Sequence, residues 1–260
     1  MVSLGLLLGR EHVAAALRRR MMLAAIVLAV IVPVPAFAVL FVKLLGLTGP
    51  VAAGIVLMAI SPGAPVALRR TLTAGGRAEF APALHLAIVL VAVVTVPATL
   101  VILDALFEAA FTISPLQVAR QVFIAQLLPM GLGVAIRVWR PVVAARLAPP
   151  LTAISNGLLV ALLAASLVVF WPSLVATGWT PVAAGVLLTA AALAVGAACA
   201  GRDAAARPQG ALAAAMRNPG LALYIGAVNQ APAGVLAAVI AYALGATVVV
   251  TAYVAWRRRS

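Results

Sequence analysis

Three arginines, Arg69, Arg70 and Arg217, lie inside long apolar stretches of the sequence, where charged side chains are uncommon. An arginine at the centre of a bilayer costs at least ~2.5–3.5 kcal/mol on insertion scales, so it faces a cavity, a partner or an interface within its reach. A guanidinium in a cavity, beside the positive end of a half-helix, favours an anionic group. We therefore take the three arginines as candidate contacts for an anionic substrate.

Each arginine also has a structural interpretation, which the sequence leaves open. Arg70 lies about 10 Å of helix before the basic end at Arg77, so its side chain could snorkel to the interface. Arg69 and Arg70 point about 100° apart on a helix, so one cavity cannot receive both. Arg217 could instead form an ion pair or cap the carbonyls of a half-helix that ends at Asn218.

Two interruptions rich in proline and glycine lie close to these arginines: Ser61-Pro62-Gly63-Ala64-Pro65 and Asn218-Pro219-Gly220. Proline removes a helix hydrogen bond and clashes with the preceding turn, so each helix should break near the middle of the membrane. The freed backbone groups make four residues candidate substrate contacts, namely Pro62, Gly63, Asn218 and Pro219. Asn218 could equally support its own break by bonding those backbone groups.

Few residues of the sequence could support proton coupling or catalysis. His85 is the one side chain within a span that titrates near neutral pH, so it is a candidate for coupling to a proton, and simple packing is the alternative. Intramembrane catalysis needs paired carboxylates, a Ser/His or Cys/His pair, or a metal cluster near one depth, and the sequence offers none. We therefore predict no enzyme, no metal and no cofactor.

The composition indicates the elements that hold these residues. Of the 260 residues, 66% are hydrophobic and 9% are charged, against roughly 25% charged in a soluble domain. Stretches that reach the roughly 20 apolar residues of a transmembrane helix recur along the chain. We predict an all-α polytopic membrane protein with eight spans, at about 21–44, 48–74, 81–107, 119–137, 150–171, 180–199, 209–229 and 233–256.

The formal net charge of +13 is a topology signal rather than a sign of nucleic-acid binding. With Arg18, Arg19 and Arg20 in the cytoplasm, alternation across eight spans puts 13 of the 18 basic residues on that side, as the positive-inside rule requires. We expect a multi-pass protein of the inner membrane with a cytoplasmic C-terminus. Its surroundings are then the lipid bilayer, and nucleic acid is not a partner.

The two interrupted spans are five spans apart, so they cross the membrane in opposite directions. That is the pattern of an inverted repeat whose discontinuous helices meet near the midplane and form a substrate site. The first interrupted span resembles a crossover helix of the bile acid:sodium symporter family through Gly54-Ile55-Val56-Leu57-Met58-Ala59-Ile60-Ser61-Pro62-Gly63 and the later Gly75-Gly76-Arg77. The second is similar to the family's other crossover over Ala213-Ala214-Ala215-Met216-Arg217-Asn218-Pro219-Gly220-Leu221-Ala222.

The resemblance implies ten helices in two inverted five-helix repeats, divided into a core and a panel that move against each other. Residues 1–260 would form one transporter domain, with core-type helices over 21–107 and 180–256 and panel-type helices over 1–8 and 119–171. The short apolar segment 2–8 would be the tail of a span, so the first one and a half helices of the family's fold are expected to be missing from this chain.

The resemblance also shows where the sequence departs from the family, which binds sodium through oxygen ligands. The positions that align with those ligands are Leu28, Ala67, Leu68, Ala81, His85, Ala213 and Arg217. A hard cation prefers oxygen ligands with a carboxylate among them, and none remains. We therefore expect the scaffold without the sodium sites.

These observations together predict a secondary active transporter of a small organic anion that works by alternating access without sodium. A proton on His85 or exchange of one anion for another would replace sodium in the coupling. The alternative is a non-transporting membrane scaffold or sensor derived from a transporter fold, which the loss of the ion ligands favours.

Overall fold

Six apolar helices of the computed structural model are long enough to cross a membrane, and the part of the chain that the structure describes, residues 1–106 and 114–259, contains helices and no strands. The first, Arg20–Leu44, is made of α3 (Arg20–Ile31) and α4 (Pro33–Leu44), which meet at Val32. The others are α7 (Ala81–Leu106), α8–η1–α9 (Pro115–Val122, Phe123–Leu127, Leu128–Trp139), α10 (Pro141–Val169), α12 (Thr180–Cys199) and α15 (Ala233–Arg257). The protein is therefore an all-helical, multi-pass membrane protein.

Two further apolar segments are interrupted helices. The first consists of α5 (Gly49–Ala59) and α6 (Ala67–Thr73), and the second of α13 (Arg207–Ala215) and α14 (Pro219–Val228). Both breaks fall where the prolines predict them. The six continuous helices and the two interrupted ones correspond one to one with the eight predicted stretches.

The boundaries differ most at α10, which begins at Pro141 rather than near residue 150. Pro149 and Pro150 lie inside this helix. Prolines are tolerated inside membrane helices because neighbouring groups satisfy the freed backbone carbonyls. Three short helices complete the chain: α1 (Val2–Leu7), α2 (Arg10–Arg18) and α11 (Trp171–Thr177).

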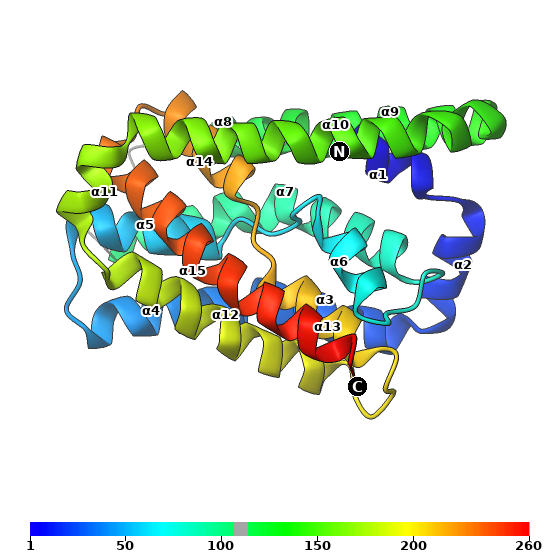
Figure 1. The fold of residues 1–260 in the computed structure, drawn as a ribbon, viewed down its shortest axis with the longest axis horizontal. Helices are drawn as coiled ribbons and strands as arrows, with labels where there is room; N and C mark the ends of the chain where they lie inside the picture. The colour runs from blue at the N-terminus through cyan, green and yellow to red at the C-terminus, as the bar shows by residue number, and fades with distance from the viewer. Residues whose placement is uncertain (107–113, 260) are drawn as a thin grey trace.

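Figure 1 shows α10 along one side of the helix bundle and α12 along the opposite side. The short helix α1 packs against α9 and α10, whereas α12 packs against α13 and α15. Glycines permit the close contacts of α12, because a Cβ at Gly185 would clash with the carbonyl of Tyr242 and one at Gly196 with that of Gly210. Small residues let helix backbones approach each other closely. Such close packing helps to hold membrane helices together, because lipid is as apolar as the side chains and does not drive the helices to associate.

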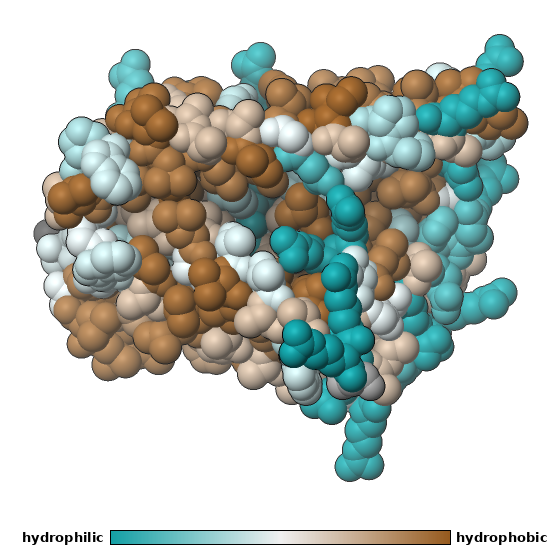
Figure 2. Space-filling model, viewed as in Figure 1, coloured by the Kyte–Doolittle hydropathy of each residue, from teal (hydrophilic) through white to brown (hydrophobic). Residues whose placement is uncertain are grey.

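Hydrophilic side chains gather at the end of the bundle that holds α2, the C-terminus and the turn between α12 and α13, while apolar side chains cover most of the rest of the visible face (Figure 2). Asp203 in that turn accepts hydrogen bonds from Arg77 at 2.8 Å and Arg19 at 3.0 Å. The Arg77 hydrogen bond, with help from the Ala205 amide and Arg19, holds the pKa of the Asp203 carboxyl below its usual value. One carboxylate thus joins three segments of the basic end.

Replacing Asp203 with asparagine is expected to lower the melting temperature in detergent by about 1–3 °C at pH 7, because an exposed ion pair contributes little. A carboxyl with a depressed pKa stabilises the fold above its unfolded pKa of about 3.9 and loses that contribution as the pH falls through the folded pKa. The gap between wild type and variant should therefore close below about pH 4. Glu79→Gln is the control, since the Glu79 side chain is more exposed than that of Asp203 and lies 3.7 Å from Arg77. An equal loss of melting temperature in that variant would mean that Asp203 contributes no more than an ordinary surface carboxylate.

Candidate functional site

The two helix breaks lie against each other. The backbone N–H of Asn218 donates to the carbonyl of Ser61 at 2.8 Å, and its side-chain Nδ2 donates to the carbonyl of Gly63 at 3.3 Å. Its Oδ1 accepts a hydrogen bond from the Leu221 amide at 3.1 Å. A single asparagine, 6% exposed, therefore bonds the first break and begins the second half-helix.

Local sequence explains both breaks. The chain between α5 and α6 contains two prolines, and Gly63 has a φ of +82°, a left-handed conformation that favours glycine. In the second break Pro219 occupies the first turn of α14, where a backbone N–H would have no partner within the helix, so proline loses no hydrogen bond there. Asn218 is the N-cap of this helix. The expectation that a half-helix ends at Asn218 is wrong: α13 ends at Ala215, and Asn218 starts α14 because its side chain caps that helix.

Arg217 lies in the second break and is buried, with 4% of its surface exposed. Its Nη2 donates to the carbonyl of Val30 on α3 at 3.0 Å, and its Nε has no hydrogen-bond partner. Within the described part of the chain, no carboxylate lies within 4 Å of this guanidinium. Arg217 is thus neither in an ion pair there nor a cap of its own half-helix, and most of its hydrogen-bonding capacity remains unused.

A cavity of about 220 Å³, the arginine cavity, lies beside Arg217. Arg70 of α6 and Pro219 of α14 also line it, and α10 supplies the apolar side of the cavity through Leu159, Val160 and Leu163. Arg69 lines a separate cavity of about 480 Å³ with Arg137 and residues of α1 and α10. The two neighbouring arginines thus face different cavities, as expected from their angular separation on a helix.

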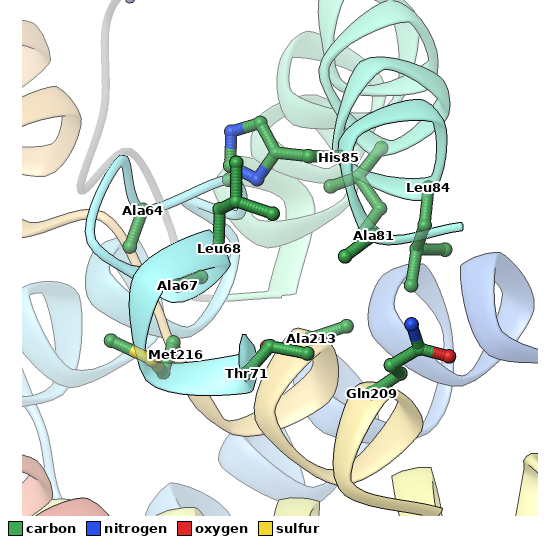
Figure 3. Close-up of a pocket in the computed structure, with 12 residues that line it drawn as sticks. Ala64, Ala67, Leu68, Thr71, Ala81, Leu84, His85, Gln209, Ala213 and Met216 are labelled. Atoms are coloured by element: carbon green, nitrogen blue, oxygen red, sulfur yellow. The ribbon is translucent and has the colours of Figure 1, made fainter. Parts of the chain in front are cut away.

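A third, smaller cavity of about 20 Å³ adjoins the first break, with room for about one water molecule. Figure 3 shows its lining residues, which come from α6, α7 and α13 and from both breaks. Among them are five of the positions that align with sodium ligands in the symporter family: Ala67, Leu68, Ala81, His85 and Ala213. Leu28 does not join them, because it lies on α3 with 55% of its surface exposed. Met216 lines this cavity and the arginine cavity, so the two are neighbours.

In a comparison with known protein families, residues 1–177 match the Sodium Bile acid symporter family. The chain belongs to this family. The match includes the first break and α7 and ends with α11. No curated protein matches the chain. Members of the sodium bile acid symporter family are membrane transporters rather than enzymes, which fits the predicted absence of catalysis.

The small cavity has few polar side chains in its lining. His85 is buried on α7, and its Nε2 has no hydrogen-bond partner. Gln209 of α13 donates through Nε2 to the carbonyl of Arg77 at 2.6 Å, whereas its Oε1 has no partner. Thr71 supplies a hydroxyl at the cavity wall. Among the described residues no cluster of three metal-ligating side chains occurs, here or elsewhere.

Sequence reasoning did not predict the surroundings of three buried or half-buried amides, those of Gln121, Gln126 and Asn229. Gln121 of α8 and Asn229, which follows α14, exchange hydrogen bonds of 2.9 and 3.2 Å. Gln126, 1% exposed, lies in the π-helical turn η1 with both side-chain polar atoms unpartnered, and its Oε1 would be 3.0 Å from a Cβ at Gly63. A glutamine within an apolar span was the available signal for Gln126, whereas the pairing of Gln121 with Asn229 depends on contacts distant in sequence.

Proposed function

We propose that this symporter-family protein is a secondary active transporter that binds a small organic anion in the arginine cavity and carries it by alternating access. The observation that supports this most strongly is the buried guanidinium of Arg217, which faces a cavity beside two broken helices and has no carboxylate nearby in the described structure. A buried charge without a partner is costly, so an anion in the cavity would relieve that cost.

Each candidate residue has a part in this proposal. Arg70, Arg217 and Pro219 line the cavity and would contact the anion. The two breaks would be held against each other by the hydrogen bonds of Asn218 to the segment that contains Pro62 and Gly63. Arg69, in the neighbouring cavity with Arg137, would attract anions on their way to the site rather than hold them.

Movement of a core against a panel would give the two sides of the membrane alternate access to the anion. The core would comprise residues 21–107 and 180–256, and the panel residues 1–8 and 119–171, within one domain. The contact between two interrupted helices five spans apart supports an inverted repeat. The hydrophilic end of the bundle includes Arg19, Arg77 and the C-terminus, which supports an inner-membrane protein with its C-terminus in the cytoplasm.

Uptake is expected to continue when sodium is replaced by choline, with a change of less than about twofold. The small cavity offers apolar side chains, one imidazole, one amide and one hydroxyl, which do not form the oxygen shell that sodium requires. Two like unit charges repel by about 4 kcal/mol at about 4 Å and by about half as much at twice that distance, at an effective dielectric near 20. Arg217 lines the adjoining arginine cavity, so its charge opposes a cation in the small cavity. The measurement is uptake of labelled anion into proteoliposomes. Loss of uptake in choline and recovery with sodium would show that backbone carbonyls hold the ion.

We propose that a proton on His85 takes the place of sodium in the coupling, because each charge moved through 100 mV supplies about 2.3 kcal/mol. Imposing and collapsing a pH gradient in the same vesicles tests it, with His85→Gln as the variant that cannot be protonated. Acceleration by internal anion, with no effect of either cation, would instead indicate exchange. A scaffold or sensor would show no uptake under any of these conditions, and that result would contradict the proposed transport itself.

A further inference from the structure

Two guanidinium groups line the arginine cavity. Arg70 reaches it from α6, and Arg217 reaches it from the break between α13 and α14. Arg70 is half-buried and Arg217 is buried. A guanidinium group carries a positive charge in proteins. The described wall of the cavity therefore holds two positive charges.

The described carboxylates lie elsewhere, at the basic end of the bundle. Glu11 is 3.5 Å from Arg137, Glu79 is 3.7 Å from Arg77, and Asp203 binds Arg19 and Arg77. The described lining residues of the cavity include no acidic side chain, and apart from the arginines their polar side chains are Thr247 and Thr251. An occupant with one negative charge would leave one guanidinium unpaired in an apolar surrounding, which is unfavourable.

The size of the cavity limits the occupant further. Its volume is about 220 Å³. Sites for drug-sized ligands are larger, about 300–1,000 Å³. The remaining wall is formed mainly by aliphatic and methionine side chains, including Met58, Val66 and Met216. The complementary ligand is therefore small, with an apolar part and charge at two points.

We infer that the preferred substrate class is a small organic dianion, such as a short dicarboxylate or a phosphate monoester, with Arg70 and Arg217 each opposing one negative charge. This inference rests on the proposed transport of an organic anion and goes beyond it in setting the charge of the substrate. Arg69 provides a matched control, because it is the neighbour of Arg70 in sequence but lines the other cavity.

The test measures dissociation constants of two matched ligand pairs by titration calorimetry on the whole 260-residue chain in detergent at pH 7.5. The first pair is succinate and its monomethyl ester, and the second is ethyl phosphate and diethyl phosphate. The two ligands of each pair belong to the same chemical class and differ by one charge. We expect at least one dianion to bind about ten- to hundredfold more tightly than its monoanionic partner, the range for a charge-assisted hydrogen bond.

Arg70→Gln is expected to weaken binding of that dianion about ten- to hundredfold and to change binding of the monoanion by less than about threefold, so that the preference disappears. Arg69→Gln is expected to keep the preference. Melting temperatures within a few degrees of wild type establish that both variants are folded. Equal binding of dianion and monoanion by wild type would overturn the inferred preference for a dianion, but it would not contradict the proposed anion transport. Absence of both binding and uptake for all four ligands would overturn the proposed function as well.

Discussion

Replacing Arg217 with glutamine is expected to reduce anion uptake about ten- to hundredfold and, at the same time, to stabilise the protein. The buried guanidinium has one hydrogen bond, to Val30, and no carboxylate partner in the described structure. Removing an unpaired charge from the interior should raise the free energy of unfolding by about 1–3 kcal/mol. A glutamine can still donate to the Val30 carbonyl, but it cannot neutralise an anion, so the transport function should be lost.

The opposite signs of the two effects separate a binding role from a structural one. Uptake into proteoliposomes and thermal melting in detergent measure them in the same preparation. Arg207→Gln is the control, because this substitution removes the same charge from the exposed start of the same interrupted helix. If uptake by Arg217→Gln is unchanged and its stability falls, Arg217 supports α3 through Val30 and does not bind the substrate.

Replacing Asn218 with alanine should have the second large effect, a loss of about 2–4 kcal/mol in the free energy of unfolding together with most of the uptake. Two hydrogen bonds depend on this side chain. The Gly63 carbonyl loses its donor, and the Leu221 amide at the start of α14 loses its cap. Both groups are buried, so water does not replace the missing partner freely.

Asn218→Ser divides this effect into its parts. Serine is uncharged and keeps an oxygen that can cap Leu221, but it is too short to replace the amide donor to Gly63, so about half of the stability loss is expected. Asn156→Ala on α10 serves as the control, since Asn156 is half-buried and lines the Arg69 cavity rather than the break. Thermal melting of the three variants measures the difference. Equal stability of Asn218→Ala and Asn156→Ala would mean that the breaks do not depend on the asparagine.

The sequence determined the number and nature of the spans, because a bilayer leaves little choice of structure. Backbone groups in lipid must be satisfied within a helix, and a helix needs about 20 apolar residues to cross, so the apolar runs alone predict helices such as α12 and α15 almost to their ends. Pro62 and Pro219 likewise predict the breaks, since a proline lacks the N–H that the helix requires. The start of α10 could not be predicted in this way, because neighbouring helices decide whether a proline pair interrupts a membrane helix.

Tertiary structure decided which residues share a site. Arg69 and Arg70 are adjacent in sequence yet line different cavities, while Arg70 and Arg217 line the same one because α6 and the second break lie together. The small cavity joins residues as distant as Ala67 and Ala213, and Gln121 finds its partner in Asn229. Apolar periodicity specifies that a helix is buried in lipid or protein, but it carries little information about which neighbour a given face meets. That choice depends on the close packing of small residues such as Gly185 and Gly196 and on hydrogen bonds such as those of Asn218, which form when helices far apart in the chain come into contact.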